Sequence, residues 1–402
     1  MMGEGALPAL LNVVAWFIAT SVAIPMSVLT VEVLVGLSPA RRALSSSRQM
    51  RVAVLVPAHN EALGIAATLA ALHEDAPAGM RILVVADNCT DETANIARRS
   101  GAEVIERHSA SERGKGFALA FGRDHLASAG TPPEVVIVLD ADCRFAPGSV
   151  EALVFACAAN PQRPAQAINL IAPVLSASPM VQISGFAMVV KNLYRSRGMQ
   201  RLGGAALLTG TGMAFPWPLF EKAHLATGSI VEDLGLGIAL TRAGHAPILI
   251  DGAKVTSEPA APDVALVQRT RWEHGFLDTI RTSALPLLAS GLARPSRSEF
   301  LLGLHLIVPP LALLLMAAAA ALILLSLLAI IGAGIIPLMF SAVVLAAAMT
   351  AIFAAWVAGG RRWLTGSALL RAPLYILWKL PIYLNFFRRR ETEWQRTPRE
   401  GE

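Results

Sequence analysis

Apolar residues are concentrated in two long runs, one near each end of the chain. Residues 5–31 contain no Asp, Glu, Lys or Arg. Because about 20 helical residues cross the hydrocarbon core of a bilayer, this run predicts one membrane-spanning helix. Residues 300–360 also lack these four residue types. At a rise of about 1.5 Å per residue they are too long for one crossing, and two helices joined near residues 332–337 fit best.

A third apolar piece, residues 369–387, is interrupted by polar residues and prolines. Arg371, Pro373, Lys379 and Pro381 all fall within it. This mixture favours a helix that lies in the membrane interface over one that crosses the bilayer. A short fourth span is the alternative.

The middle of the chain, from Arg51 to about Pro259, has a different pattern. Residues 52–56, 82–86 and 135–139 are short runs rich in β-branched residues and without polar alternation, which is typical of parallel strands buried on both faces. Stretches with helical spacing lie between these runs, over residues 62–74, 91–100 and 116–129. This alternation predicts a doubly wound α/β domain that binds its ligand at the carboxyl ends of the strands.

Composition supports a membrane protein. Hydrophobic residues make up 54% and charged residues 16% of the 402 residues, whereas charged residues are about 25% of a soluble globular chain. An ordinary soluble enzyme is therefore excluded. The net charge is +5, but arginines are not interleaved with aromatic residues, so nucleic acid is not an expected partner. The three cysteines form no CxxC pair, so neither a zinc knuckle nor a disulfide scaffold is expected.

Positive charges set the expected orientation, because the loops that remain in the cytoplasm are enriched in Lys and Arg. The chain then divides into four parts: a spanning helix in residues 1–40, a cytoplasmic domain in 41–299 with interfacial segments near its end, two spanning helices in 300–360, and an interfacial helix with a basic cytoplasmic tail in 361–402. We expect a protein integral to the cytoplasmic (inner) membrane. The arginines that decide this orientation are Arg41, Arg42, Arg48, Arg51, Arg294, Arg297, Arg361 and Arg362.

Carboxylates follow two of the predicted strands. Asp140 and Asp142 come directly after the third strand, and Asp87 ends the second. Oxygen ligands of this kind suit Mg²⁺ or Mn²⁺, which also bind substrate phosphates. Acidic turns after strands are common, so the pair alone is weak evidence for a metal, and Asp91 is expected to cap the helix that follows it.

Two further segments have residues suited to a phosphorylated ligand. Gly114-Lys115-Gly116 places a flexible cationic turn before a helix, where backbone amides favour anions. It is not a Walker A loop, because the Gly-x-x-x-x-Gly-Lys-Ser/Thr pattern is absent: Gly116 and then Phe117 follow Lys115. Glu232 and Asp233 precede a helical run; negative charge is favoured at a helix start, so these two have a purely structural alternative.

Taken together, these motifs resemble membrane-bound family 2 glycosyltransferases, including polysaccharide synthases and ceramide glucosyltransferase-like enzymes. The similarity covers about residues 52–275, and its last element matches that family's Gln-x-x-Arg-Trp signature. The motifs occur in the family's order: Val56-Pro57-Ala58-His59-Asn60-Glu61, Asp87-Asn88-Cys89-Thr90-Asp91, Gly114-Lys115-Gly116, Asp140-Ala141-Asp142, Gly210-Thr211-Gly212, Glu232-Asp233 and Gln268-Arg269-Thr270-Arg271-Trp272.

The resemblance implies a GT-A type fold, with a mostly parallel sheet, and a role for each matched residue. Asp142 would ligate Mg²⁺ or Mn²⁺, and Asp233 would be the catalytic base. The remaining donor-binding residues would be Pro57, Glu61, Asp87, Lys115, Asp140 and Arg271. The acceptor side would be formed by Gly212, Glu232, Gln268 and Trp272.

The function that follows is an inverting, metal-dependent transfer of a hexosyl or N-acetylhexosaminyl group from a nucleotide diphosphate sugar, with a UDP-sugar as the favoured donor. The acceptor would be a lipid-linked or growing glycan at the bilayer. A processive polysaccharide synthase subunit is the alternative, and an export partner or oligomer would then supply further helices. A catalytically inactive scaffold or transport component is more distant, because neither long apolar run contains a charge that marks a transport path.

Overall fold

The computed structural model describes residues 6–39, 50–77, 79–228, 231–259 and 262–388. It divides into two compact units. Residues 173–202 belong with the helices of the chain's two ends, although segments of the sheet precede and follow them in the sequence. Among the described residues, the sheet unit lies within 39–172 and 203–275, and the helical unit lies within 6–38, 173–202 and 276–388.

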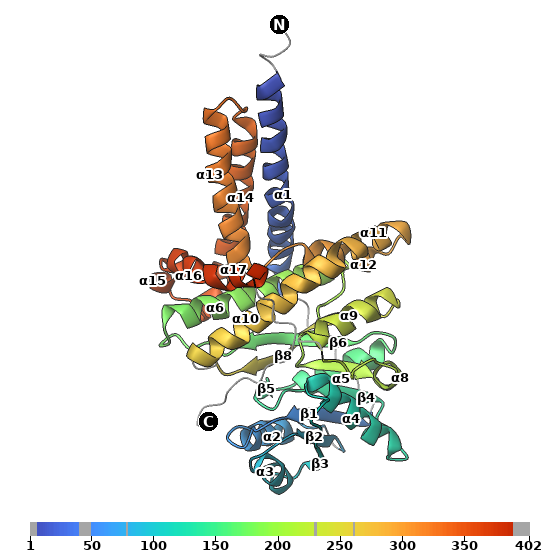
Figure 1. The fold of residues 1–402 in the computed structure, drawn as a ribbon. Helices are drawn as coiled ribbons and strands as arrows, with labels where there is room; N and C mark the ends of the chain where they lie inside the picture. Colours follow the sequence, from blue (N-terminus) through green and yellow to red (C-terminus); the bar gives the residue numbers. More distant parts are fainter. Residues whose placement is uncertain (1–5, 40–49, 78, 229–230, 260–261, 389–402) are drawn as a thin grey trace. The chain divides into compact units, whose positions relative to one another are not determined.

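The sheet unit is built on an eight-stranded sheet among the described residues, in the order β3-β2-β1-β4-β7-β6-β8-β5 (Figure 1). β3, β2, β1 and β4 pair parallel, and so do β6 and β8. β7 runs antiparallel to β4 and β6, and β5 antiparallel to β8, which makes the sheet mixed. The strands are β1 Val52–Ala58, β2 Arg81–Asp87, β3 Glu103–Arg107, β4 Val135–Val138, β5 Cys143–Phe145, β6 Ala165–Ile171, β7 Met213–Pro216 and β8 Ile248–Ser257.

Helices cover both faces of this sheet, as the alternating pattern predicts, and the α/β fold is confirmed. On β1, Val54 and Val56 face one apolar core together with Leu69 of α2. Leu55 faces the opposite core, which contains Leu119 of α4. The helices of this unit are α2 Ile65–Glu74, α3 Thr93–Arg99, α4 Lys115–Ser128, α5 Ser149–Ala159, α8 Trp217–Glu221 and α9 Glu232–Arg242, and α10 Pro262–Thr279 runs from this unit into the helical one.

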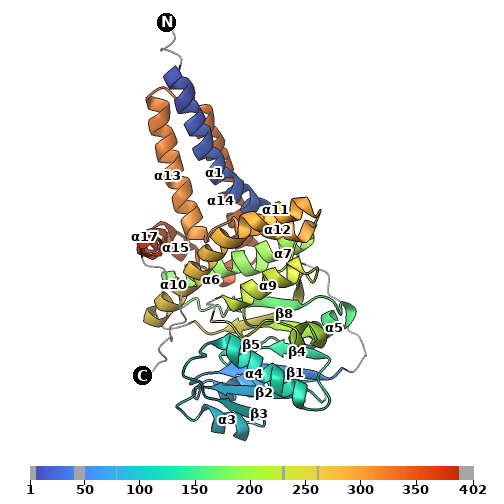
Figure 2. The same cartoon turned by 45° about the vertical axis from the view of Figure 1, so that its right-hand side comes forward.

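Three helices of the helical unit are long and apolar enough to cross a membrane: α1 Ala6–Gly36, α13 Leu311–Ile330 and α14 Ile336–Ala358. They lie side by side in both views (Figures 1 and 2). Ala15 and Ala19 of α1 share an apolar cluster with Leu325 and Leu328 of α13. α13 and α14 lie within residues 300–360, where the sequence predicts two spanning helices, and the first residues of that run complete a separate helix, α12 Arg297–Leu306.

The remaining elements of the helical unit are short. Residues 366–388 are not one helix but three, separated at Arg371 and Lys379, and none of the three has the length of a span. Their place in the interface stays a prediction. The short elements are α6 Pro179–Val189, the π-helix η1 Val190–Arg195, α7 Ser196–Arg201, the π-helix η2 Ile280–Ala284, α11 Leu285–Ala293, α12 Arg297–Leu306, η3 Gly360–Arg362, α15 Gly366–Leu369, α16 Ala372–Trp378 and α17 Leu380–Arg388.

A buried ion cluster joins three elements of the helical unit. Glu32 lies in the last turns of α1, and its carboxylate accepts a hydrogen bond from Arg195 Nε at 2.7 Å and contacts His305 Nδ1 at 2.8 Å. Arg195 also donates to the carbonyl oxygen of His305 at 3.1 Å. All three residues are at most 5% exposed. The carboxylate is therefore compensated on both oxygens, which buried charges require.

The end of α1 is held by further contacts with residues 194–201. An added Cβ at Gly36 would lie 1.9 Å from the carbonyl oxygen of Tyr194, and one at Gly198 would lie 1.9 Å from that of Glu32. Only glycine permits this backbone approach. Arg197 donates to the Gly36 carbonyl at 3.1 Å and Arg201 to the Val35 carbonyl at 2.6 Å, so cationic side chains satisfy the C-terminal carbonyls of the helix.

Replacing Glu32 by Ala should destabilise the protein by about 3–5 kcal/mol, because Arg195 would remain buried without its counter-charge. The thermal unfolding midpoint in detergent should fall accordingly. Glu134→Gln, which removes the partner of Arg51 in an exposed pair, should change stability by less than about 1 kcal/mol. Equal midpoints for the two variants would contradict the importance of the cluster.

Candidate active site

Three parallel strands end at the same edge of the sheet, and the predicted polar residues follow them there. β1 ends at Ala58, β2 at Asp87 and β4 at Val138. Since ligands of open α/β sheets bind outside the carboxyl ends of the strands, this edge is the expected site. The chain then places the start of α4, at Lys115, beside the residues that follow β4.

The ammonium group of Lys115 lies among carboxylates. Its Nζ forms an ion pair with Asp140 Oδ1 and donates to the carbonyl oxygen of Gly210 at 2.8 Å. Burial alone would lower the pKa of this amine, but the charges of Asp140, Glu232 and Asp233 raise the pKa of Lys115 to about 12. Lys115 is therefore a permanent cation at neutral pH.

Gly210 brings Asp233 to the same place. A Cβ added to Gly210 would lie 3.2 Å from Asp233 Oδ2 and 3.2 Å from Lys115 Nζ, so both charged groups lie against this glycine. Its φ of +80° is also one that favours glycine. The structure thus brings together three predicted site residues, Lys115, Asp140 and Asp233, from distant parts of the sequence.

The turn of residues 209–212, called the glycine turn below, is held in place by hydrogen bonds of Gln166 and Thr211. Buried Gln166 on β6 donates from Nε2 to the Thr211 carbonyl at 2.9 Å and accepts from the Thr209 amide at 3.1 Å. The Thr211 hydroxyl accepts from the Asp140 amide at 3.1 Å. Gly212 has a φ of +65°, and a Cβ there would lie 2.7 Å from Val255 Cγ1, so this residue shapes the turn by its lack of a side chain.

Asp140, Asp142 and Cys143 form the candidate metal site, with ligand atoms within 4.8 Å of one another. Loss of hydration and the charge of Asp140 raise the pKa of the Asp142 carboxyl, and a cation between the two carboxylates would relieve that repulsion. Burial raises the pKa of the Cys143 thiol well above its ordinary value, which keeps it protonated. The two carboxylates are hard oxygen donors and fit Mg²⁺ or Mn²⁺.

The neighbouring strand ends place Asp87 beside the residues that follow β1. His59 Nδ1 contacts the Asp87 carbonyl oxygen at 2.7 Å, and the carboxylate of Asp87 pairs with Arg107 at 2.8 Å. Pro57 is half-buried in β1, and the half-buried Glu61 follows three residues after the strand ends. Its backbone amide donates to Thr93 Oγ1 at 2.7 Å, which ties this loop to α3.

Asp91 has the structural role expected of it. Its carboxylate accepts from the amide of Thr93 at 3.0 Å and from that of Ala62 at 3.1 Å. It thus satisfies an amide in the first turn of α3 and holds the loop that follows β1. The N-cap position itself is Glu92, one residue later than expected.

α10 carries Gln268, Arg271 and Trp272. The side chain of Gln268 lies outside the described part of the structure, Arg271 is half-buried, and Trp272 is 39% exposed. One turn further, a Cβ at Gly275 would lie 2.6 Å from Val231 Cγ1. Since Val231 directly precedes Glu232, α10 passes close to the start of α9.

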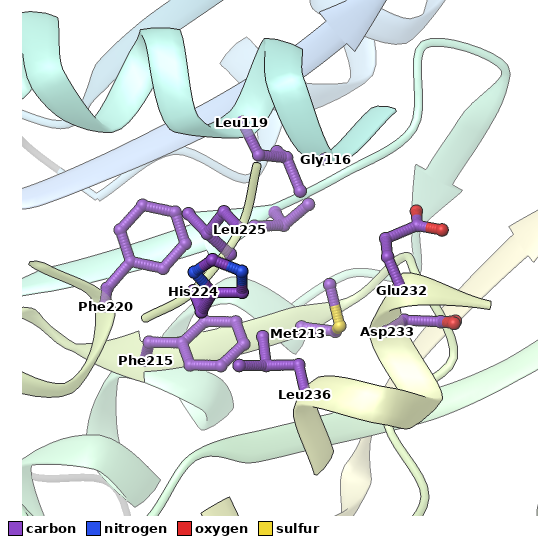
Figure 3. A pocket seen from close by; sticks show the side chains of 11 residues that line it. Gly116, Leu119, Met213, Phe215, Phe220, His224, Leu225, Glu232, Asp233 and Leu236 are labelled. Carbon is purple, nitrogen blue, oxygen red and sulfur yellow. The ribbon is translucent and has the colours of Figure 1, made fainter. Parts of the chain in front are cut away.

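A small pocket with mainly apolar walls adjoins the carboxylates of Glu232 and Asp233. Figure 3 shows Glu232 and Asp233 at one end, with the rings of Phe215 and Phe220 and the side chain of His224 at the other. Burial and the charge of Asp233 raise the pKa of Glu232 to about 7. Glu232 is therefore only partly ionised at neutral pH.

Two residues at this edge were not expected from the sequence. Arg107 ends β3 and binds Asp87, and Gln166 holds the glycine turn. β3 is a mostly polar strand with only its last residue buried, so no apolar run marks it. The one signal for Arg107 is that β3 continues the series of predicted parallel strands, so its last residue is expected at the same edge of the sheet.

The family model described as "Glycosyltransferase like family 2" matches residues 49–275, more than half of the chain. Two curated relatives are the uncharacterized glycosyltransferases Rv0539 of Mycobacterium tuberculosis (strain ATCC 25618 / H37Rv) and Mb0553 of Mycobacterium bovis (strain ATCC BAA-935 / AF2122/97). Each is 40% identical over 103 residues, which are 26% of this chain and 42% of the relative. The matched part is thus less than half of either relative.

The fold is similar to that of the mannosyltransferase PcManGT from Pyrobaculum calidifontis, solved in complex with GDP-Man and Mn²⁺. The TM-score is 0.55 at 22% sequence identity, and the alignment covers 92% of this chain and 99% of that one. The GT-A type architecture expected from the sequence is confirmed by this match.

The pKa of Glu232 predicts a pH-dependent stability. A carboxyl whose pKa rises from 4.5 to about 7 on folding holds more protons in the folded state, so its contribution to stability falls as the pH rises through this range. Glu232→Gln should remove this loss. Measured in EDTA, the unfolding midpoint of the variant relative to wild type should increase between about pH 5 and about pH 7.5. The exposed Glu92→Gln should show no such trend, and a flat difference for Glu232→Gln would refute the shift.

Proposed function

This chain belongs to glycosyltransferase-like family 2, and from that premise we propose that it moves one sugar from a nucleotide diphosphate sugar to an acceptor in the membrane, with inversion at the anomeric carbon. The observation that carries the proposal is the meeting of Lys115, Asp140 and Asp233 around Gly210. A cation for the phosphates and a carboxylate for the acceptor hydroxyl then lie in one site.

The donor would lie along the edge of the sheet. Asp87, with Pro57 and Glu61 nearby, would hold the base and ribose, and Lys115 and Arg271 would contact the diphosphate. Asp142 would hold a divalent cation, with Asp140 beside it at the donor. That cation would stabilise the charge of the departing nucleotide diphosphate.

Asp233 is the proposed base. Its Oδ1 accepts from the amide of Leu234 at 2.7 Å, which fixes the carboxylate at the start of α9 and leaves Oδ2 on the side of Gly210. A single displacement requires one base to accept the proton of the acceptor hydroxyl. Gly212, Glu232, Gln268 and Trp272 would line the acceptor side, as in enzymes with the Gln-x-x-Arg-Trp signature.

The membrane supports the choice of acceptor. α1, α13 and α14 have the length and composition of spans, so a lipid or lipid-linked glycan is the acceptor class that shares the protein's location. We place the sheet unit in the cytoplasm, at the inner membrane, on the basis of the arginines that flank the spans. Transfer of a single sugar is favoured over processive synthesis, because three spans in the described residues are few for a self-contained export pore.

The first experiment identifies the product. Purified protein in nanodiscs is incubated with UDP- and GDP-sugars, Mg²⁺ or Mn²⁺ and a membrane lipid extract, and the products are weighed by mass spectrometry. GDP-mannose is included because the Pyrobaculum enzyme binds it. We expect a lipid that carries one sugar, with the anomeric configuration inverted by NMR, and no product in EDTA. A ladder of products would favour the processive alternative, and nucleotide release without a glycoside would refute transfer.

Asp233→Asn should lower kcat by at least about 100-fold, because the amide cannot accept the proton. Its affinity for the donor, measured by calorimetry, should stay within about threefold of wild type. Asp142→Asn should instead lose metal-dependent donor binding, and Asp124→Asn, an exposed carboxylate on α4, should resemble wild type. Near wild-type turnover of Asp233→Asn would show that another group is the base.

A further inference from the structure

Arg107 is a buried cation at the active-site edge that the proposed mechanism does not use. It ends β3, and because β2 and β3 pair parallel, it lies opposite Asp87 in the register. It is 8% exposed. Its Nη1 donates to Asp87 Oδ1 at 2.8 Å and to the carbonyl oxygen of Glu112 at 2.8 Å, and its Nη2 donates to Glu112 Oε2 at 2.8 Å.

These bonds determine what Asp87 can do. Asp87 is 7% exposed, and Arg107 supplies the counter-charge that a carboxylate buried to this extent requires. Oδ1 accepts from Arg107 and, at 3.1 Å, from Asn88 Nδ2. Within the described residues Oδ2 accepts no hydrogen bond. One oxygen is therefore fixed and the other remains available, in a set orientation, for an N–H or O–H donor of a ligand.

The same guanidinium holds the loop that leads to Lys115. Glu112 is bound by Arg107, Ser109 donates its amide to Asn88 Oδ1 at 2.9 Å, and Glu112 donates its amide to Ser109 Oγ at 3.1 Å. The guanidinium carbon also lies 5.5 Å from the ring centroid of Phe117, in the first turn of α4. Arg107 thus connects Asp87 with the helix start that carries Lys115.

We propose that Arg107 is a positioning residue for the nucleotide, which fixes Asp87 and the start of α4 so that nucleoside and diphosphate are recognised as one unit. The inference rests on the proposed function, in which Asp87 and Lys115 bind these two parts of the donor. A fork with two arms is required for this role, because Asp87 and Glu112 lie on different segments and a point charge cannot align both.

The test compares Arg107→Gln and Arg107→Lys with Arg98→Gln. Arg98 pairs with Glu106, the residue before Arg107, but both side chains are exposed, so it is a matched control. Binding of UDP, UMP, GDP and GMP is measured by calorimetry with Mn²⁺, and kcat and KM are measured with the donor. Both Arg107 variants should bind the preferred mono- and diphosphate at least about tenfold more weakly. KM should rise while kcat stays within about threefold, and Arg98→Gln should match wild type.

A structural role alone gives a different result. If the Arg107 variants lose folded protein and kcat while KM and nucleotide affinity are unchanged, the inference is wrong. If Arg107→Gln does not fold, the double variant Asp87→Asn, Arg107→Gln is tested, because it removes both charges of the buried pair. It should recover the unfolding midpoint but not the affinity for nucleotides. Recovery of both would overturn the inference. Wild-type protein that binds none of the four nucleotides would refute the proposed function itself, whereas weak binding by Asp87→Asn with normal binding by the Arg107 variants would refute the inference alone.

Discussion

The ammonium of Lys115, held among Asp140, Asp233 and Glu232, is the interaction on which the rest of the site depends. Without it, three carboxylates from two separate segments would repel one another at short range. With it, the three carboxylates lie close together, and burial and the charge of Asp233 raise the pKa of Glu232 to about 7, so that this group is partly protonated at neutral pH. The site still carries more negative than positive charge, so it favours a cationic ligand such as a divalent metal.

The sheet makes this arrangement possible because its parallel strands deliver polar residues to one edge. The register of β1 with β2 and β4 places the residues after each strand side by side. The antiparallel strand β7 then brings the glycine turn of residues 209–212 back to Asp140. Gln166 and Thr211 satisfy the polar groups of this turn, which lets two glycines with positive φ lie next to the charged cluster.

The sequence predicted the parts of the fold whose pattern is local. Apolar β-branched runs located β1, β2 and β4, and charge-free runs located the three helices that are long and apolar enough to cross a membrane. It did not predict that residues 173–202 join the helical unit, because the spacing of apolar residues in a helix does not show which unit the helix packs against. The charge-free run ends before Glu32, and α1 continues to Gly36, within the predicted residues 1–40, with Glu32 bound by Arg195. Arg107 was missed for a related reason, since the strand it ends shows no apolar run and its partner is distant in sequence.

Two kinds of buried charge can now be distinguished in this molecule. In the cluster of Glu32, Arg195 and His305, both oxygens of the Glu32 carboxylate are bound by protein groups, so this carboxylate is complete without any ligand. The pair of Asp87 and Arg107 satisfies one oxygen of Asp87 and, among the described residues, leaves the other without a hydrogen bond, and Lys115 lies among three carboxylates. A buried carboxylate with both oxygens bound by protein groups helps to hold the structure together and has no oxygen left to accept a hydrogen bond from a substrate. Buried carboxylates without enough partners lower the stability of the protein until a ligand binds. Those of Asp87 and of the residues around Lys115 lie at the edge of the sheet where, in the proposed function, a nucleotide and a metal would bind. The distribution of buried charge, more than any single motif, therefore separates the residues that hold this protein together from those that we propose to act on a substrate.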